Sequence, residues 1–232
     1  MEAGPLTPLV ERVLGERTTG ATVLVGLAGS VAVGKSTLAH TLADALAPHA
    51  VEVVGTDGFL LPNAVLVERD LFLRKGFPES YDEAALLEFL AAVRTGDPAA
   101  SVPVYSHAVY DVVDERRLVG APDVCILEGV NALRFADALD LALYLHAEEE
   151  HVVRWYADRF VLECVAARND ETSFYRSWAA LSEGEQRILA EQFWFGINHP
   201  NLVEHIAPTA ARADAVVVKG PDHAILDIEW RA

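Results

Sequence analysis

The sequence is poor in cysteine and has no long hydrophobic run. Cys125 and Cys164 both lie in apolar surroundings, so we expect two buried thiols in a reducing compartment and no disulfide. No apolar stretch approaches the length that crosses a membrane, and residues 1–10 lack the basic start and apolar run of a signal peptide. These absences argue against a disulfide scaffold and predict a cytoplasmic protein without a membrane partner.

Basic residues are also scarce. The chain has 18 Lys and Arg against 35 Asp and Glu, which gives a formal net charge of −17. Such a surface repels a nucleic acid backbone, so we expect no nucleic acid partner and a dedicated pocket for any bound anion. Only Lys35, Lys75 and Lys219 are lysines. Either chance or a need for a compact ammonium group at those positions explains why they are not arginine.

The hydrophobic pattern alternates between short strands and helices. Hydrophobic residues make up 52% of the 232 residues, which suits one globular domain. The expected strands cover 22–28, 51–54, 124–127, 141–145 and 215–218, with an edge strand over 224–230. The expected helices cover 35–47, 82–94, 148–167 and 183–197. This order predicts an α/β fold with a parallel sheet of about five strands covered by helices on both faces.

One segment between the first strand and the first helix fits the pattern G-x-x-x-x-G-K-[ST]. In such a loop the backbone N–H groups converge on phosphate oxygens, and the helix that follows adds its positive end. Lys35 would reach the β- and γ-phosphates of ATP, and the Ser36 hydroxyl would bind Mg²⁺. The alternative, an ordinary glycine-rich turn, does not explain the strand before the loop and the helix after it. The predicted nucleotide-binding residues are Gly29, Ser30, Val31, Ala32, Val33, Gly34, Lys35, Ser36 and Thr37.

Two acidic residues follow expected strands, at the edge where open α/β sheets bind ligands. Asp57 comes after the second strand and Glu128 after the strand over 124–127. We interpret Asp57 as a general base and Glu128 as a Mg²⁺ ligand, although an Asx-turn and an ordinary loop start are the alternatives. The guanine-specific N-K-x-D motif of GTPase switches is absent from the sequence. A kinase domain over 22–232, preceded by an arm over 1–21, is therefore favoured over a switch or a non-catalytic ATP-binding module.

With these motifs in place, the chain resembles the type I (bacterial) pantothenate kinases, within the P-loop kinases related to uridine kinase and phosphoribulokinase. The resemblance implies transfer of the γ-phosphate of ATP, with Mg²⁺, to the primary hydroxyl of pantothenate, the committed step towards coenzyme A. It also implies a helical lid around 148–198 and a homodimer. Besides 29–37, the segments that carry it are 56–60, 62–63, 74–82, 103–107, 110–111, 126–129, 131, 155–156, 159–160, 197–198, 201–202, 208–209, 219 and 223.

The resemblance assigns roles to matching positions. Asp57 is implied as the base, and Arg159 as the group that stabilises the transferring phosphoryl. His223 is implied as an adenine contact. A surface arginine is the alternative for Arg159, since its position alone fixes no role. The implied contacts to the small hydroxylic acceptor are Asp57, Lys75, Tyr105, His107, Tyr156 and Asn198.

The chain also departs from that family around the acceptor. Glu163 and Arg168 stand where the family places aromatic residues, and Ala210 replaces an arginine. A charge in an apolar wall is costly unless it is paired, so these changes predict a pocket more polar than the dimethyl group of pantothenate requires. On that basis we expect a more polar relative of pantothenate as the preferred acceptor. A nucleoside or a sugar is the alternative acceptor class.

Overall fold

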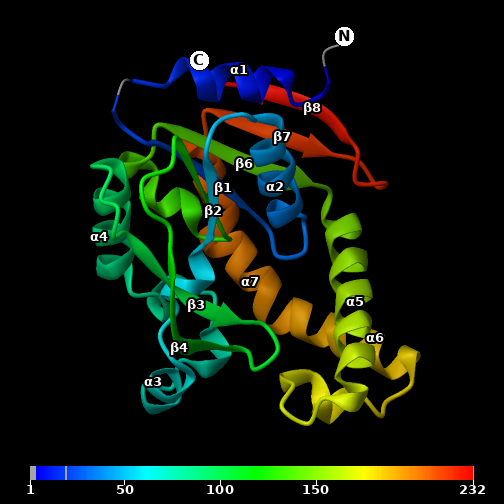
Figure 1. Ribbon diagram of the computed structural model, residues 1–232. Helices are drawn as coiled ribbons and strands as arrows, with labels where there is room; N and C mark the ends of the chain where they lie inside the picture. Colours follow the sequence, from blue (N-terminus) through cyan, green and yellow to red (C-terminus); the bar gives the residue numbers. More distant parts are fainter. Residues whose placement is uncertain (1–3, 19, 232) are drawn as a thin grey trace.

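The computed structural model describes residues 4–18 and 20–231, and a six-stranded sheet runs through its centre (Figure 1). Along the sheet the strand order is β2-β5-β1-β6-β7-β8. The first five strands are parallel, and β8 pairs antiparallel with β7 at one edge. This arrangement confirms the predicted fold class. The strands are β1 (Val23–Gly29), β2 (Val51–Gly55), β5 (Val124–Glu128), β6 (Leu141–Ala147), β7 (Ala215–Lys219) and β8 (Ile225–Trp230).

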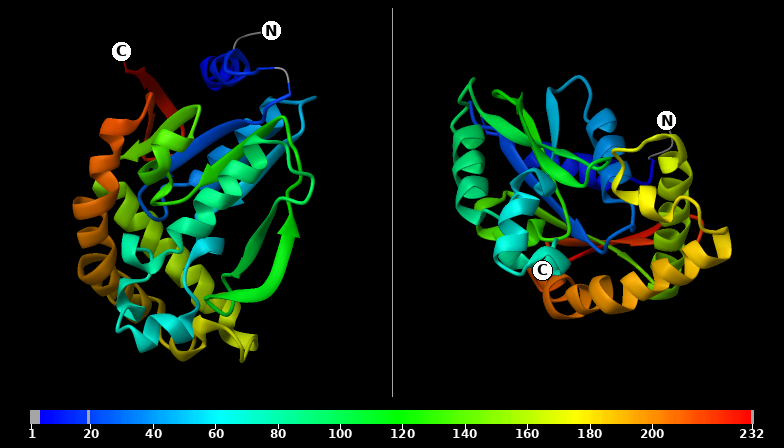
Figure 2. Two further views of the ribbon diagram at one scale, coloured as in Figure 1. Left: turned by 90° about the vertical axis from the view of Figure 1, so that its left-hand side faces the viewer. Right: turned by 90° about the horizontal axis from the view of Figure 1, so that it is seen from below.

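Strand β1 lies at the middle of the parallel strands and is buried along its whole length. Because side chains alternate along a strand, Leu24 and Ala28 pack into one hydrophobic cluster while Val25 and Leu27 pack into another on the opposite face. Helices cover both faces, as the two rotated views show (Figure 2). The apolar run that predicted this strand therefore reflects burial on two sides.

Most helices match the predicted segments, with small shifts at their ends. Asp82 precedes α4 and caps it, because its carboxylate accepts a hydrogen bond from the backbone N–H of Ala85 at 3.0 Å. Within residues 4–18 and 20–231, no helix is both long enough and apolar enough to cross a bilayer. The helices are α1 (Thr7–Gly15), α2 (Lys35–Ala45), α3 (Asn63–Glu68), α4 (Glu83–Arg94), α5 (Glu149–Ala166), α6 (Glu183–Phe193) and α7 (His199–Asn201).

The helix that begins with α6 continues through α7, with two widened π-helical turns at Trp194–Asn198 and Leu202–Ile206. Pro200 lies between them, has no N–H to donate and would crowd the carbonyl four residues earlier, so a wider turn relieves the conflict. The sequence prediction ended this helix at residue 197, which is wrong. The helix carries Asn198 and Asn201 across the open end of the molecule.

An antiparallel hairpin of β3 (Ser101–Ser106) and β4 (Asp111–Leu118) forms a second, separate sheet. The sequence analysis predicted no strand here. Most of β4 is exposed and includes the charged run Asp114 to Arg117, so it lacks the apolar pattern that revealed the central strands. Its turn nevertheless reaches the ligand-binding side of the sheet and brings Tyr105, His107 and Tyr110 there.

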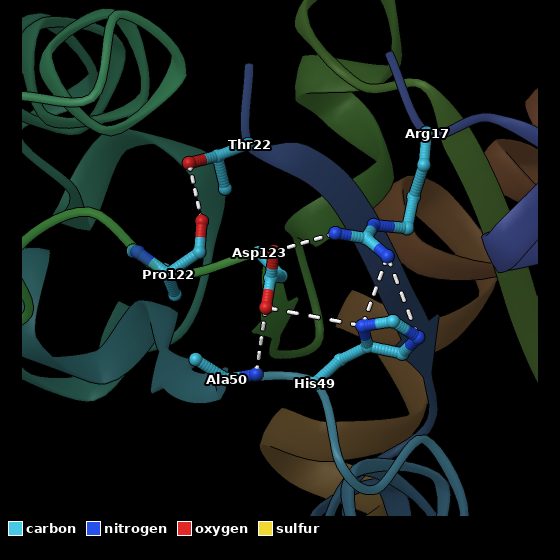
Figure 3. Close-up of polar contacts among 6 residues, drawn as sticks. All are labelled: Arg17, Thr22, His49, Ala50, Pro122 and Asp123. Atoms are coloured by element: carbon cyan, nitrogen blue, oxygen red, sulfur yellow. Dashed lines mark hydrogen bonds and ion pairs between the residues drawn. The ribbon is translucent and has the colours of Figure 1, made fainter. Parts of the chain in front are cut away.

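At the amino ends of β1, β2 and β5, an ion-pair cluster fixes the chain that enters β1 (Figure 3). The Arg17 guanidinium donates to Asp123 at 2.6 Å and contacts the His49 ring at 2.9 Å. The second carboxylate oxygen of Asp123 accepts from the backbone N–H of Ala50 at 2.9 Å, and the Thr22 hydroxyl donates to the Pro122 carbonyl at 2.7 Å. These contacts join the segment after α1 to the starts of β2 and β5.

We expect the packing of α1 to contribute to the stability of the whole domain, because Leu9 is fully buried in the cluster that contains β1. Leu9→Ala should lower the free energy of unfolding by about 2–5 kcal/mol, the usual cost of this change in a core. Leu14→Ala on the same helix is the control, since Leu14 is 37% exposed. Urea denaturation measures both, and equal small effects would show that α1 is not part of the cooperative core.

Candidate active site

The loop between β1 and α2 is the predicted phosphate cradle, and its backbone is sharply curved. Gly34 precedes α2 with φ of 95°, and Ala32 also has a positive φ of 61°. A Cβ on Gly29 would lie 2.4 Å from the Leu145 carbonyl oxygen, so only glycine fits there. No side chain caps the first turn of α2. Its free N–H groups suit a phosphate, which fits the nucleotide-binding prediction.

Lys35 is buried beside this cradle, and its ammonium group donates to the Ser30 carbonyl at 2.8 Å. Burial lowers the pKa of Lys35, while the nearby carboxylates of Glu128 and Asp57 oppose that shift and the Arg159 guanidinium adds to it. Two cations and two carboxylates from four different elements therefore meet at one point. The two cations can pair with phosphate oxygens, while the two carboxylates can accept a proton or bind a metal ion.

The two predicted acidic residues lie at neighbouring strand ends, as parallel pairing requires. Gly55 at the end of β2 pairs with Glu128 at the end of β5, and Asp57 follows in the helical turn Thr56–Phe59. The Ser36 hydroxyl donates to the Glu128 carboxylate at 2.7 Å. Within the described chain, no group of three or more His, Cys, Asp or Glu side chains could bind a metal alone. A hydroxyl and one carboxylate suit Mg²⁺ that takes its other ligands from phosphates and water.

The charged residues described above and Ser36 line a cavity of about 490 Å³ at the carboxyl end of the sheet. Four of the predicted residues do not line this cavity: Gly29, Ser30, Val33 and His223. Most of the predicted site residues therefore line one space, although they come from distant parts of the sequence. Those that line it are Val31, Ala32, Gly34, Lys35, Ser36, Thr37, Asp57, Lys75, Tyr105, His107, Glu128, Tyr156, Arg159 and Asn198.

Lys75 also lines the cavity, and several contacts hold its ammonium group in place. Its ammonium group donates to the Asn63 side-chain oxygen at 2.6 Å and to the Tyr110 carbonyl. It also lies over the Tyr110 ring, 4.2 Å from the centroid. Burial lowers the pKa of Lys75 to about 8, although Asp111 and Asp57 favour the charged form. An ammonium group has three N–H donors, so one remains for an oxygen atom of a ligand.

His223 lies in the turn between β7 and β8, stacked on Trp155 with 4.1 Å between ring centroids. Burial and the nearby Lys219 and Arg154 lower the pKa of His223, which favours a neutral ring. The Lys219 ammonium group donates to the Val33 carbonyl at 2.8 Å and so ties this turn to the phosphate cradle. The pair of flat rings next to the cradle would suit a nucleotide base.

The sequence analysis did not assign several aromatic residues that line the cavity. Tyr110 stacks on Phe174 at 4.3 Å, and Phe160 packs edge-on against Tyr175 at 5.6 Å. Burial raises the pKa of Tyr110 to about 12, so its phenol is neutral. The aromatic run from Phe174 to Trp178 was the available signal for this wall. Its place near Tyr105 and Tyr110 depends on the unpredicted hairpin.

The expectation of a charged acceptor wall is wrong. Arg168 is exposed in the turn after α5, and neither it nor Glu163 lines the cavity. Glu163 lies 3.8 Å from Arg159, and both side chains are partly exposed. Because α5 ends at Ala166, Arg168 points into solvent from the short turn Ala167–Asn169. The aromatic wall on this side is supplied by Phe160 and Tyr175.

Known proteins resemble this chain in sequence and in fold. The pantothenate kinase of Sorangium cellulosum (strain So ce56) is 48% identical over 223 residues, which cover 90% of this chain and 72% of that protein. The enzyme of the same name from Cutibacterium acnes is 44% identical over 88% of this chain and 68% of the relative. No protein-family model matches the sequence.

Among solved structures, D-glycerate 3-kinase from Cryptococcus neoformans superposes with a TM-score of 0.70 at 14% identity, over 97% of this chain and 99% of that one. Phosphoribulokinase from Rhodobacter spheroides gives a TM-score of 0.53 at 14% identity, over 92% and 81%. At this level of identity the two structures show the fold alone, a P-loop kinase fold. The sequence relatives show the family in addition to the fold: the chain belongs to the pantothenate kinase family.

Proposed function

We propose that this protein transfers the γ-phosphoryl group of Mg·ATP to the primary hydroxyl of pantothenate. The observation that carries the proposal is that one cavity is lined by the phosphate cradle, Asp57, several aromatic side chains and Lys75. Membership in the pantothenate kinase family supports the choice of acceptor. The cradle end of the cavity takes the nucleotide and the Lys75 end takes the acceptor.

In this proposal, Lys35 binds the β- and γ-phosphates and Arg159 contacts the phosphoryl group as it moves. Asp57 lines the cavity near both Lys35 and Lys75 and accepts the proton of the attacking hydroxyl. Ser36 and Glu128 hold Mg²⁺, which neutralises charge on the phosphates when it is bound. His223 and Trp155 contact the adenine ring.

The acceptor end combines hydrogen-bond donors with apolar surface. Lys75 keeps one N–H free, and His107, Tyr156 and Asn198 line the same space. Phe160 and Tyr175 offer flat apolar faces that suit the dimethyl group of pantothenate. With Arg168 outside the cavity, the structural argument for a more polar acceptor no longer holds.

An ADP-release assay coupled to a reporter enzyme tests the proposed activity. The acceptors are pantothenate, uridine, ribulose 5-phosphate and simple sugars, each with Mg·ATP. We expect kcat/KM for pantothenate above about 10⁴ M⁻¹s⁻¹, within the range of enzymes acting on their own substrates. A larger kcat/KM for uridine or a sugar would contradict the proposal and favour the alternative acceptor class.

A homodimer and a cytoplasmic location stay predictions.

Asp57→Asn should lower kcat by roughly 10²–10⁴-fold, the usual contribution of a positioned base. Affinity for ATP should change little, because Asp57 lies outside the phosphate cradle. Steady-state kinetics and a fluorescent nucleotide titration measure the two effects. An unchanged kcat would assign Asp57 to the turn alone.

The acceptor site should depend on pH through Lys75, whose pKa is about 8. Below this pH the ammonium group has three N–H donors, whereas the neutral amine has two, both of which Asn63 and Tyr110 occupy. We therefore expect kcat/KM for pantothenate to fall as the pH rises past about 8. Lys75→Arg should be less active but lose this decline, because a guanidinium stays charged. A decline that persists in Lys75→Arg would assign it to another group.

A further inference from the structure

The carbonyl oxygen of Gly76 lies between two buried side-chain amides. The Asn131 amide group donates to it at 2.8 Å and the Asn201 amide group at 2.9 Å. Asn131 is 1% exposed and Asn201 is 7% exposed. A carbonyl oxygen has two lone pairs, so both of its acceptor positions are occupied. The orientation of the amides is fixed by this acceptor, since a flipped amide would place oxygen against oxygen.

The peptide group that joins Lys75 to Gly76 is fixed as well. Its N–H donates to the Ser80 hydroxyl at 2.9 Å, and Ser80 is fully buried. Gly76 has φ of 91°, a left-handed conformation in which a side chain is strained. The residue directly before this peptide is Lys75, whose ammonium group is held at its far end by Asn63. Both ends of Lys75 are thus constrained by buried hydrogen bonds.

The two amides belong to elements that carry other parts of the proposed site. Asn131 comes three residues after Glu128, at the end of β5, and Asn201 comes three residues after Asn198 on the α6–α7 helix. Residues three apart on a helix lie on one face, and Asn198 and Asn201 both line the cavity. The Gly76 carbonyl therefore connects the end of β5, which carries Glu128, with the helix that carries Asn198 and the loop that carries Lys75.

We propose that Asn131 and Asn201 are positioning residues that hold the Gly76 carbonyl and thereby aim the Lys75 ammonium group at the acceptor. This inference rests on the proposed acceptor site. A buried amide that serves packing alone could be replaced by an apolar group of similar shape, whereas these two donate to one shared atom. Loss of either bond frees the backbone that follows Lys75 and weakens acceptor binding, while the ATP cradle stays intact.

Further buried polar atoms lie between the two amides and the base. The side-chain oxygens of Asn131 and Asn201 and the hydroxyls of Thr56 and Tyr81 make no well-formed hydrogen bond among the described residues, although the Tyr81 hydroxyl lies within reach of Thr56 and Asn131. Tyr81 lies next to Thr56 and Asn131, and Thr56 immediately precedes Asp57. Four such atoms in one place are expensive in a core that serves packing alone. Their position behind Lys75 and Asp57 agrees with a role in orienting the site.

Asn201→Asp tests the proposal, because a carboxyl group can donate to the Gly76 carbonyl only when it is protonated. We expect KM for pantothenate to rise about tenfold or more at neutral pH, the effect of one lost buried hydrogen bond. KM for ATP should stay within about twofold, and the defect should shrink as the pH falls and the acid becomes protonated. Asn131→Asp should show the same pattern, which covers the case in which Asn201→Asp does not fold.

Asn169→Asp is the matched control, since Asn169 is exposed in the turn after α5 and the substitution adds the same charge. Other titratable groups lie around Lys75 and Gly76, and the control retains all of them: Asp57, Arg74, Glu79, Tyr81, Tyr105, Tyr110, Asp111 and His205. A pH-dependent KM in Asn169→Asp matching that of Asn201→Asp would overturn the proposal. So would an Asn201→Asp enzyme whose KM for both substrates rises equally.

A second measurement does not depend on turnover. Amine-reactive labelling of Lys75, followed by mass spectrometry across a pH series, reports how accessible and how basic its amine is. We expect Lys75 in Asn201→Asp to react faster than in the wild type, with Lys219 unchanged as an internal reference. Equal labelling of Lys75 in both proteins would contradict the positioning role. If the wild type failed to phosphorylate pantothenate, the proposed acceptor would fall, yet labelling would still decide whether Asn201 positions Lys75.

Discussion

The whole site depends on parallel pairing, which brings the carboxyl ends of β1, β2 and β5 to one edge of the sheet. Because the register aligns Gly55 with Glu128, the two acidic residues that follow these strands can only lie close together. The phosphate cradle follows β1, which lies beside β5. Hairpin β3–β4 and the α6–α7 helix then close the remaining sides of the cavity. The parallel strands therefore position the phosphate cradle and the two acidic residues, while the hairpin and the helix form the walls of the acceptor end.

A second constraint is charge. The chain carries a net charge of −17, yet its three lysines are all nearly buried at or beside the site. Lys35 and Lys75 line the cavity, and Lys219 binds the Val33 carbonyl of the cradle. Desolvation lowers the pKa of each of these lysines, so a bound polyanion gains from every ammonium group that it neutralises. A small positive centre inside an acidic surface favours a compact phosphate ligand over an extended one.

Much of this arrangement could be predicted from the sequence, because it depends on local patterns. Burial on two faces makes β1 and β5 uniformly apolar, and the loop glycines at Gly29 and Gly34 are required by the backbone. The hairpin β3–β4 was missed because its exposed strand carries charges. Arg168 was placed in the acceptor wall from sequence position alone, although the helix ends two residues before it. The link between Asn131, Asn201 and Gly76 joins residues up to 125 positions apart, which no local pattern indicates.

Analysis of the reaction product tests the central claim most directly. After incubation with Mg·ATP and pantothenate, phosphorus–proton correlation NMR shows which carbon carries the new phosphate. We expect one product whose phosphorus couples to the isolated CH₂ of the primary alcohol, formed by the wild type and formed far more slowly by Asp57→Asn. Phosphorus coupled to the single proton of the secondary alcohol, or ADP release without a phosphorylated acceptor, would contradict it.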